Sequence, residues 1–176
     1  MGFGPKWMAW TCGMLYTSST RIMINGTPGR PIYNCKGLRQ GAPLSLMLFI
    51  LVMEPLHRMF ELAISRGIMA PLAPRGMDHR LSMFADNVMI FLKPNDQDLQ
   101  ACSSLLRIFV EASGLHVNMQ KSAAYPIRCS ADSCDRTLAI LGCPAGSFPC
   151  RYLGLPLTLR KQSAAQLSGL VDQLAV

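Results

Sequence analysis

The stretch Phe84-Ala85-Asp86-Asn87 is the part of the sequence that indicates the fold most clearly, and Asp86 is its most informative residue. Two short apolar runs flank it, over residues 81–83 and 88–92. Apolar segments joined by a short polar turn predict a β-hairpin, and here the turn would place the Asp86 carboxylate at the hairpin tip. Chemistry with two divalent ions held about 3.5–4 Å apart needs clustered carboxylates. This turn offers one carboxylate beside the amide of Asn87.

Composition indicates a globular protein with a basic surplus. The 176 residues suffice for one domain or for a piece of a larger protein, and half of them are apolar. The net charge of +7 comes from 17 basic and 10 acidic residues. Such a surplus suits a polyanionic partner such as nucleic acid, and a basic protein without that partner fits it equally well.

The charge is unevenly distributed along the chain. Glu54 is the first acidic residue, and five basic residues precede it: Lys6, Arg21, Arg30, Lys36 and Arg39. The first third of the chain is therefore a candidate phosphate-facing surface. It cannot supply an acidic metal ligand.

Cysteine usage and hydropathy favour a reduced, intracellular protein, cytoplasmic or nuclear. The seven cysteines are odd in number and form no Cys-x-x-Cys pair, so neither a disulfide framework nor a standard zinc ribbon is implied. No signal peptide is recognisable. The longest apolar run, 46–53, is far shorter than the roughly 20 residues that span a bilayer, so no membrane partner is expected.

Apolar periodicity and turn residues predict a mixed order of helices and antiparallel hairpins. Helices are expected over 5–17, 43–65, 95–113, 135–141 and 164–174, and strands over 20–25, 31–36 and 152–157. Trp7, Trp10, Met14 and Leu15 would form the apolar side of the first helix, and Pro55 should kink the second. This order predicts an α+β layer fold.

Four segments occur in one order along the chain. They are Gly37-Leu38-Arg39-Gln40-Gly41-Ala42-Pro43-Leu44-Ser45, Phe84-Ala85-Asp86-Asn87, Ser113-Gly114-Leu115 with Asn118 and Lys121-Ser122, and Arg151-Tyr152-Leu153-Gly154-Leu155-Pro156-Leu157. In this order and spacing they resemble the reverse transcriptase of LINE-type (non-LTR) retrotransposons, of the kind abundant in plant genomes. The resemblance covers nearly the whole chain and implies an RNA-directed DNA polymerase palm that uses Mg²⁺ and binds RNA or DNA.

The resemblance also implies roles for single residues. Asp86 would be a catalytic metal ligand, and Asn87 stands where the family has a second aspartate. Lys121 matches a lysine near the phosphates of the incoming nucleotide. Template and substrate contacts would fall to Arg39, Gln40, Gly41, Phe84 and Ala85. Two alternatives stay open from the residues alone: Asp86 as a turn aspartate that binds its own backbone, and Arg39 as a solvated surface charge.

The chain departs from the family pattern at several positions. Ala42 stands where the family usually has aspartate, and Leu46 where proline is usual. The first catalytic strand and the fingers of the family lie upstream of the segment that matches Gly2-Phe3-Gly4-Pro5, so both are expected to be absent. We expect a partial palm domain over 1–160 and the start of a truncated thumb or connection segment over 161–176.

These departures predict a degenerate member of the family. A single carboxylate should bind Mg²⁺ weakly or not at all. The chain would then be an inactive, retrotransposon-derived fragment, with a non-catalytic nucleic-acid-binding module or an open reading frame without a selected role as the alternatives. Without the missing strand the Asp86 hairpin has an unpaired edge, which predicts a fold that is either marginal or dependent on a partner chain.

Overall fold

The computed structural model of the chain describes residues 2–35, 37–38, 41–73 and 79–161. The chain divides into two compact units, Met1–Phe49 and Ile50–Val176, and each is described by itself. The predicted helix over 164–174 lies outside the described residues, as do the candidate residues Arg39 and Gln40.

Helix α1, Pro5–Tyr16, begins the first unit and confirms the predicted helix. Its proline is at the first turn, where a missing N–H leaves no hydrogen bond unmade. The apolar side of this helix is exposed: Trp10 is 64% accessible, and the buried residue of the helix is Thr11. The large side chains cover one another on the surface instead: Phe3 stacks on Trp7 at 4.1 Å, and the Lys6 ammonium lies 5.1 Å from the Trp10 ring centre.

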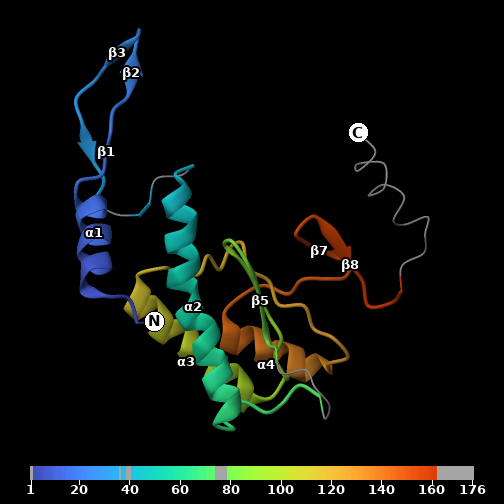
Figure 1. Cartoon of the computed structure of the whole chain (residues 1–176). Coiled ribbons are helices and arrows are strands. Elements are labelled where there is room, and N and C mark those ends of the chain that lie inside the picture. The colour runs from blue at the N-terminus through green and yellow to red at the C-terminus, as the bar shows by residue number, and fades with distance from the viewer. Residues whose placement is uncertain (1, 36, 39–40, 74–78, 162–176) are drawn as a thin grey trace. The chain divides into compact units, whose positions relative to one another are not determined.

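A two-stranded ribbon follows α1 (Figure 1). Strand β1, Ser19–Thr20, pairs with β4, Ile32–Tyr33, and β2, Met23–Ile24, pairs with β3, Thr27–Pro28. Asn25 and Gly26 have φ of +50° and +80°, which is the type I′ turn that the Asn-Gly pair predicts. The predicted continuous strand over 20–25 is wrong, because the chain there forms two short strands, β1 and β2, that belong to separate pairs.

Helix α2, Pro43–Ser65, has the predicted bounds. It ends in a Schellman motif: the Ile68 N–H donates to the Ala63 carbonyl at 2.9 Å, and the Gly67 N–H donates to the Ile64 carbonyl at 3.0 Å. Gly67 has φ of +68°, a conformation that glycine adopts without steric cost. Pro55 lies inside the helix, and the kink expected there stays a prediction.

Helices α3 and α4 belong to the second unit. Helix α3, Asp96–Ser113, is capped by Asn95, whose side chain accepts the Asp98 N–H at 2.7 Å. Helix α4, Ala131–Leu141, starts four residues earlier than expected because the Ser130 hydroxyl caps it by accepting the Ser133 N–H at 3.3 Å. The buried apolar core of this unit is formed mainly by side chains of α2 and α3: Met53, Leu56, Phe60, Ala63, Leu99, Cys102 and Phe109.

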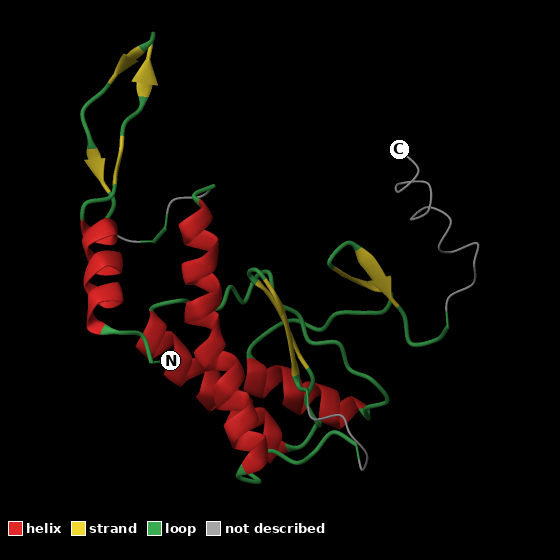
Figure 2. Cartoon of the chain, viewed as in Figure 1, coloured by secondary structure: helices red, strands yellow, loops and turns green. Residues whose placement is uncertain are grey.

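Two hairpins complete the second unit (Figure 2). Strands β5, Leu81–Phe84, and β6, Asn87–Ile90, form the predicted hairpin around Asp86. A single strand over 152–157 is wrong, because β7, Cys150–Tyr152, and β8, Leu155–Leu157, pair across a turn at Leu153 and Gly154. The described part of the chain is therefore mixed α+β, with four helices and small antiparallel two-stranded sheets. Its assignment to a polymerase palm stays a prediction.

Candidate functional site

The β5–β6 hairpin presents Asp86 in a two-residue turn. Phe84 pairs with Asn87, so only Ala85 and Asp86 lie between the strands. Ala85 has φ of +50°, and positive φ at the first turn residue alone is typical of a type II′ turn, where glycine is usual. An alanine in this region costs roughly 1–2 kcal/mol. The four residues from Phe84 to Asn87 are exposed, with Phe84 62% accessible.

The Asp86 carboxylate has no protein partner among the described residues. No hydrogen bond or ion pair from that part of the chain reaches it. The backbone hydrogen bond of an ordinary turn aspartate is thus not formed in this geometry. Asp86 is held at the tip by the strand pairing on both sides of it, and a ligand would meet it from solvent.

The described residues do not fit a centre for two magnesium ions. No group of three His, Cys, Asp or Glu side chains in the described ranges lies close enough together to hold a metal ion. Asn87 stands beside Asp86, and its amide oxygen brings no negative charge to balance a dication. Magnesium requires near-octahedral oxygen ligands, and a two-ion site must clamp both the attacking and the leaving oxygens. One exposed carboxylate and one amide do not provide these ligands.

Lys121 lies in a turn after α3 that Asn118 shapes. The Lys121 N–H donates to the Asn118 carbonyl at 3.1 Å and to the Asn118 Oδ1 at 3.2 Å, and the Ser122 hydroxyl donates to the same carbonyl at 2.9 Å. The Lys121 residue is exposed, and no ion pair joins its side chain to Asp86 or to any other described residue. These hydrogen bonds fix the backbone of the turn, but no ion pair joins the Lys121 ammonium to the hairpin.

Of the predicted template loop, Gly41 is the candidate residue that is described. Its φ is +81°, which glycine adopts without steric cost. A Cβ at this position would meet no other atom, so the backbone conformation favours glycine and steric crowding does not. Gly41 belongs to the first compact unit, whereas Asp86 and Lys121 belong to the second.

A buried ion pair at the base of the hairpin was missed by sequence reasoning. The Arg80 Nη1 donates to the Asp98 Oδ2 at 2.7 Å, and the two residues are 2% and 0% exposed. The other oxygen of Asp98 accepts the Ala70 N–H at 3.0 Å. One signal existed: Asp98 lies four residues before Cys102 on the apolar stripe of α3, where an acid needs a partner. The sequence does not indicate which cation that partner is.

Tyr152 makes a second long-range contact that the sequence does not indicate. Its hydroxyl donates to the Ser82 carbonyl at 3.2 Å and lies 2.9 Å from the Ser82 hydroxyl, which can donate to it in turn. These bonds join β7 to β5 across 70 residues of sequence.

The Cys102 thiol lies beside the buried ion pair and is itself 1% exposed. Burial raises the pKa of Cys102 to about 12, opposed in part by the positive charge of Arg80. This cysteine is therefore a neutral core residue at physiological pH and no candidate nucleophile.

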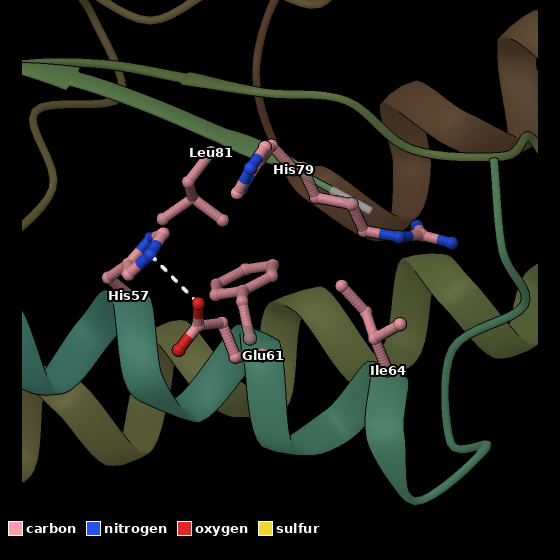
Figure 3. Close-up of a pocket in the computed structure, with 7 residues that line it drawn as sticks. His57, Glu61, Ile64, His79 and Leu81 are labelled. Atoms are coloured by element: carbon pink, nitrogen blue, oxygen red, sulfur yellow. Dashed lines mark ion pairs between the residues drawn. The ribbon is translucent and has the colours of Figure 1, made fainter. Parts of the chain in front are cut away.

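A small cavity lies between α2 and the start of β5 (Figure 3). His57, Glu61 and Ile64 line it from the helix, Leu81 lines it from β5, and His79 lines it from the segment just before β5. His57 Nε2 and Glu61 Oε1 are 3.2 Å apart. Its volume of about 10 Å³ is at the lower limit for one water molecule, so it cannot hold a nucleotide.

In the described ranges no helix is long and apolar enough to cross a bilayer.

Comparison with known proteins shows the family of the chain. Residues 3–157 match the family described as reverse transcriptase (RNA-dependent DNA polymerase). The Transposon TX1 uncharacterized 149 kDa protein of Xenopus laevis is 29% identical over 123 residues. That alignment covers 69% of this chain and 9% of the transposon protein, so the chain spans a small part of its relative. Since the family match extends over most of the sequence and includes the Asp86 hairpin, the chain belongs to the reverse transcriptase family.

Proposed function

We propose that this chain is the palm segment of a LINE-type (non-LTR) reverse transcriptase, of the kind found in plant genomes, and that the 176-residue polypeptide alone does not polymerise DNA. The order of the four sequence segments supports the non-LTR assignment, as does the similarity to a transposon protein. Asp86 on a β-hairpin supports the descent from a polymerase.

One observation carries the proposed inactivity: Asp86 is followed by Asn87, and no cluster of three metal-binding side chains occurs in the described ranges. Nucleotidyl transfer develops negative charge on the attacking oxygen and on the leaving pyrophosphate, and two metal ions normally offset it. A hairpin with one negative charge attracts a dication weakly in water. The exposed tip also lacks the desolvation that would strengthen that attraction.

A primer-extension assay tests this proposal directly. The purified chain is incubated with a DNA primer on an RNA template and with Mg²⁺ or Mn²⁺, and an active reverse transcriptase serves as the control for the buffer and substrates. We expect no extension from the chain. Extension that Asp86→Ala abolishes would contradict the proposed inactivity.

The variant Asn87→Asp distinguishes two causes of inactivity: the amide at position 87 and the shortage of other metal ligands. It restores the second acid of the hairpin without adding any further ligand. We expect it to remain inactive, because a pair of adjacent carboxylates still leaves most of the ligand positions of two ions unfilled. Activity restored by this single change would show that the amide alone silences the chain.

A non-catalytic nucleic-acid-binding module is the second candidate function. It is favoured by the five basic residues that precede the first acid, Glu54, and by the exposure of Arg21 and Arg30 on the ribbon. Binding to single-stranded RNA, measured at two salt concentrations, tests it. Affinity that is absent or independent of salt would dismiss this function.

A further inference from the structure

We infer that the buried Arg80–Asp98 pair positions the β5–β6 hairpin, so that Arg80 and Asp98 are positioning residues for the Asp86 tip. The inference rests on the proposed function in one respect, since it takes the Asp86 hairpin to be the functional element. The pair itself is a structural feature that can be tested without any activity.

The Asp98 carboxylate connects three separate segments of the second unit. Its Oδ2 accepts from Arg80, which directly precedes β5, and its Oδ1 accepts the N–H of Ala70 in the segment after α2. Its own N–H is held by the Asn95 cap, which fixes the carboxylate at the first turn of α3. The start of the hairpin is thereby tied to a helix and to a loop at one point.

The backbone transmits this attachment to the tip. The Phe91 N–H donates to the Arg80 carbonyl at 2.8 Å, so the strand pairing extends to Arg80 itself. From there the ladder is continuous to the Phe84–Asn87 pair that closes the turn. Residues two apart on a strand share a face, so Ser82, which is bonded to Tyr152, lies on the same side of β5 as Arg80. The hairpin is held at two points on one face.

The energetics of the pair argue for geometry rather than for stability. Arg80 Nε and Nη2 are buried and find no hydrogen-bond partner among the described residues. A buried ion pair with unmet donors is a poor stabiliser, and apolar residues of similar volume often replace such a pair without loss. Apolar residues cannot supply a directional hydrogen bond. The Arg80–Asp98 bond fixes the position of the start of β5 relative to α3.

Three variants separate positioning from stability: Arg80→Met, Asp98→Leu and the double variant. Each single variant leaves one buried charge without its partner, so we expect its urea midpoint to fall. The urea midpoint of the double variant should return most of the way to that of the original protein. We nevertheless expect its β5–β6 backbone amides to exchange with deuterium about tenfold faster than in the original protein, while the amides around Leu99 and Phe109 in α3 keep their rates.

The double variant decides the outcome. Return of the hairpin amides to their original exchange rates together with the midpoint would overturn the inference, because the pair would then be purely structural. Arg58→Met is the matched control, since Arg58 makes an exposed pair with Glu54 on α2 and should change neither quantity.

A measurement on the unmodified protein covers the case in which the variants fail to fold. NMR of the arginine side chains should show one guanidinium N–H set protected from exchange and in contact with α3. Absence of a protected set would also overturn the inference. Both measurements are independent of polymerisation, so failure of the proposed function and failure of this inference are distinguishable.

Discussion

At the scale of single residues, the backbone of Ala85 makes the first prediction. Its φ of +50° is unfavourable for an L-residue with a Cβ and costs glycine nothing. Ala85→Gly should therefore leave stability unchanged or raise it by up to about 1 kcal/mol, since relief of strain outweighs or balances the entropy that glycine adds to the unfolded chain. Urea unfolding monitored by circular dichroism measures the difference.

Ala101→Gly in α3 is the matched control. The chemical change is the same, but Ala101 has helical backbone angles, so this variant should lose about 1 kcal/mol. Equal losses at the two positions would mean that the turn at Ala85 is not in the left-handed region.

The pKa of Cys102 makes a second residue-scale prediction. The folded value of about 12 lies above the ordinary value of 9.0, so the folded state holds the thiol proton more tightly than the unfolded state does. Its contribution to stability is therefore complete below pH 9 and is lost between pH 9 and 12, at up to about 1.4 kcal/mol per pH unit. The difference in unfolding free energy between the original chain and Cys102→Ala, measured from pH 8 to 10.5, should narrow accordingly.

Residues also mark what the sequence can and cannot predict about the site. Asp86 is foreseeable because its signal is local: two apolar runs and a turn place it. Asp98 and Arg80 are 18 residues apart, and their pairing depends on where the first turn of α3 lies relative to the residue before β5. A local pattern contains no information about that arrangement, so the ion pair could only be found in three dimensions.

At the scale of elements, long helices and the β5–β6 hairpin were predictable, and strands of two or three residues were not. The bounds of α2 and the Asn95 cap of α3 follow from periodicity and capping chemistry, which act within one or two turns. The ribbon of the first unit and the β7–β8 hairpin consist of strands of two or three residues. In such strands the turn residues decide the pairing, as Leu153 does with φ of +53° where glycine would be expected.

The contact between hairpins makes a prediction at the same scale. Tyr152→Phe removes the hydroxyl that bonds Ser82 and keeps the ring, so stability should fall by about 0.5–1.5 kcal/mol. Exchange of the β7–β8 amides should accelerate, because this bond anchors that hairpin to β5. Tyr125→Phe is the control, as its hydroxyl makes no hydrogen bond with the described residues, and it should have little effect. Equal effects from both variants would refute the anchoring role.

For the molecule as a whole, the charge distribution predicts how binding to nucleic acid depends on salt. The chain has a net charge of +7, and the residues before Glu54 include five bases and no acid. If up to five phosphates are neutralised, the affinity for single-stranded RNA should fall by up to about 100-fold between 50 and 200 mM salt, because each contact releases about 0.7 counterion. Fluorescence anisotropy with a labelled oligonucleotide measures the slope.

Two variants that each remove one positive charge locate the contacts with phosphate. Arg21 is exposed on the ribbon without an ion pair in the described part of the chain, whereas Arg58 is paired with Glu54 and Glu61, at 2.9 Å in each case. Arg21→Gln should reduce the salt slope by about 0.7, and Arg58→Gln should leave it nearly unchanged, because the Arg58 charge is already offset. If both variants reduce the slope equally, the chain attracts RNA through its net charge, and the first third of the sequence is not a distinct phosphate-binding surface.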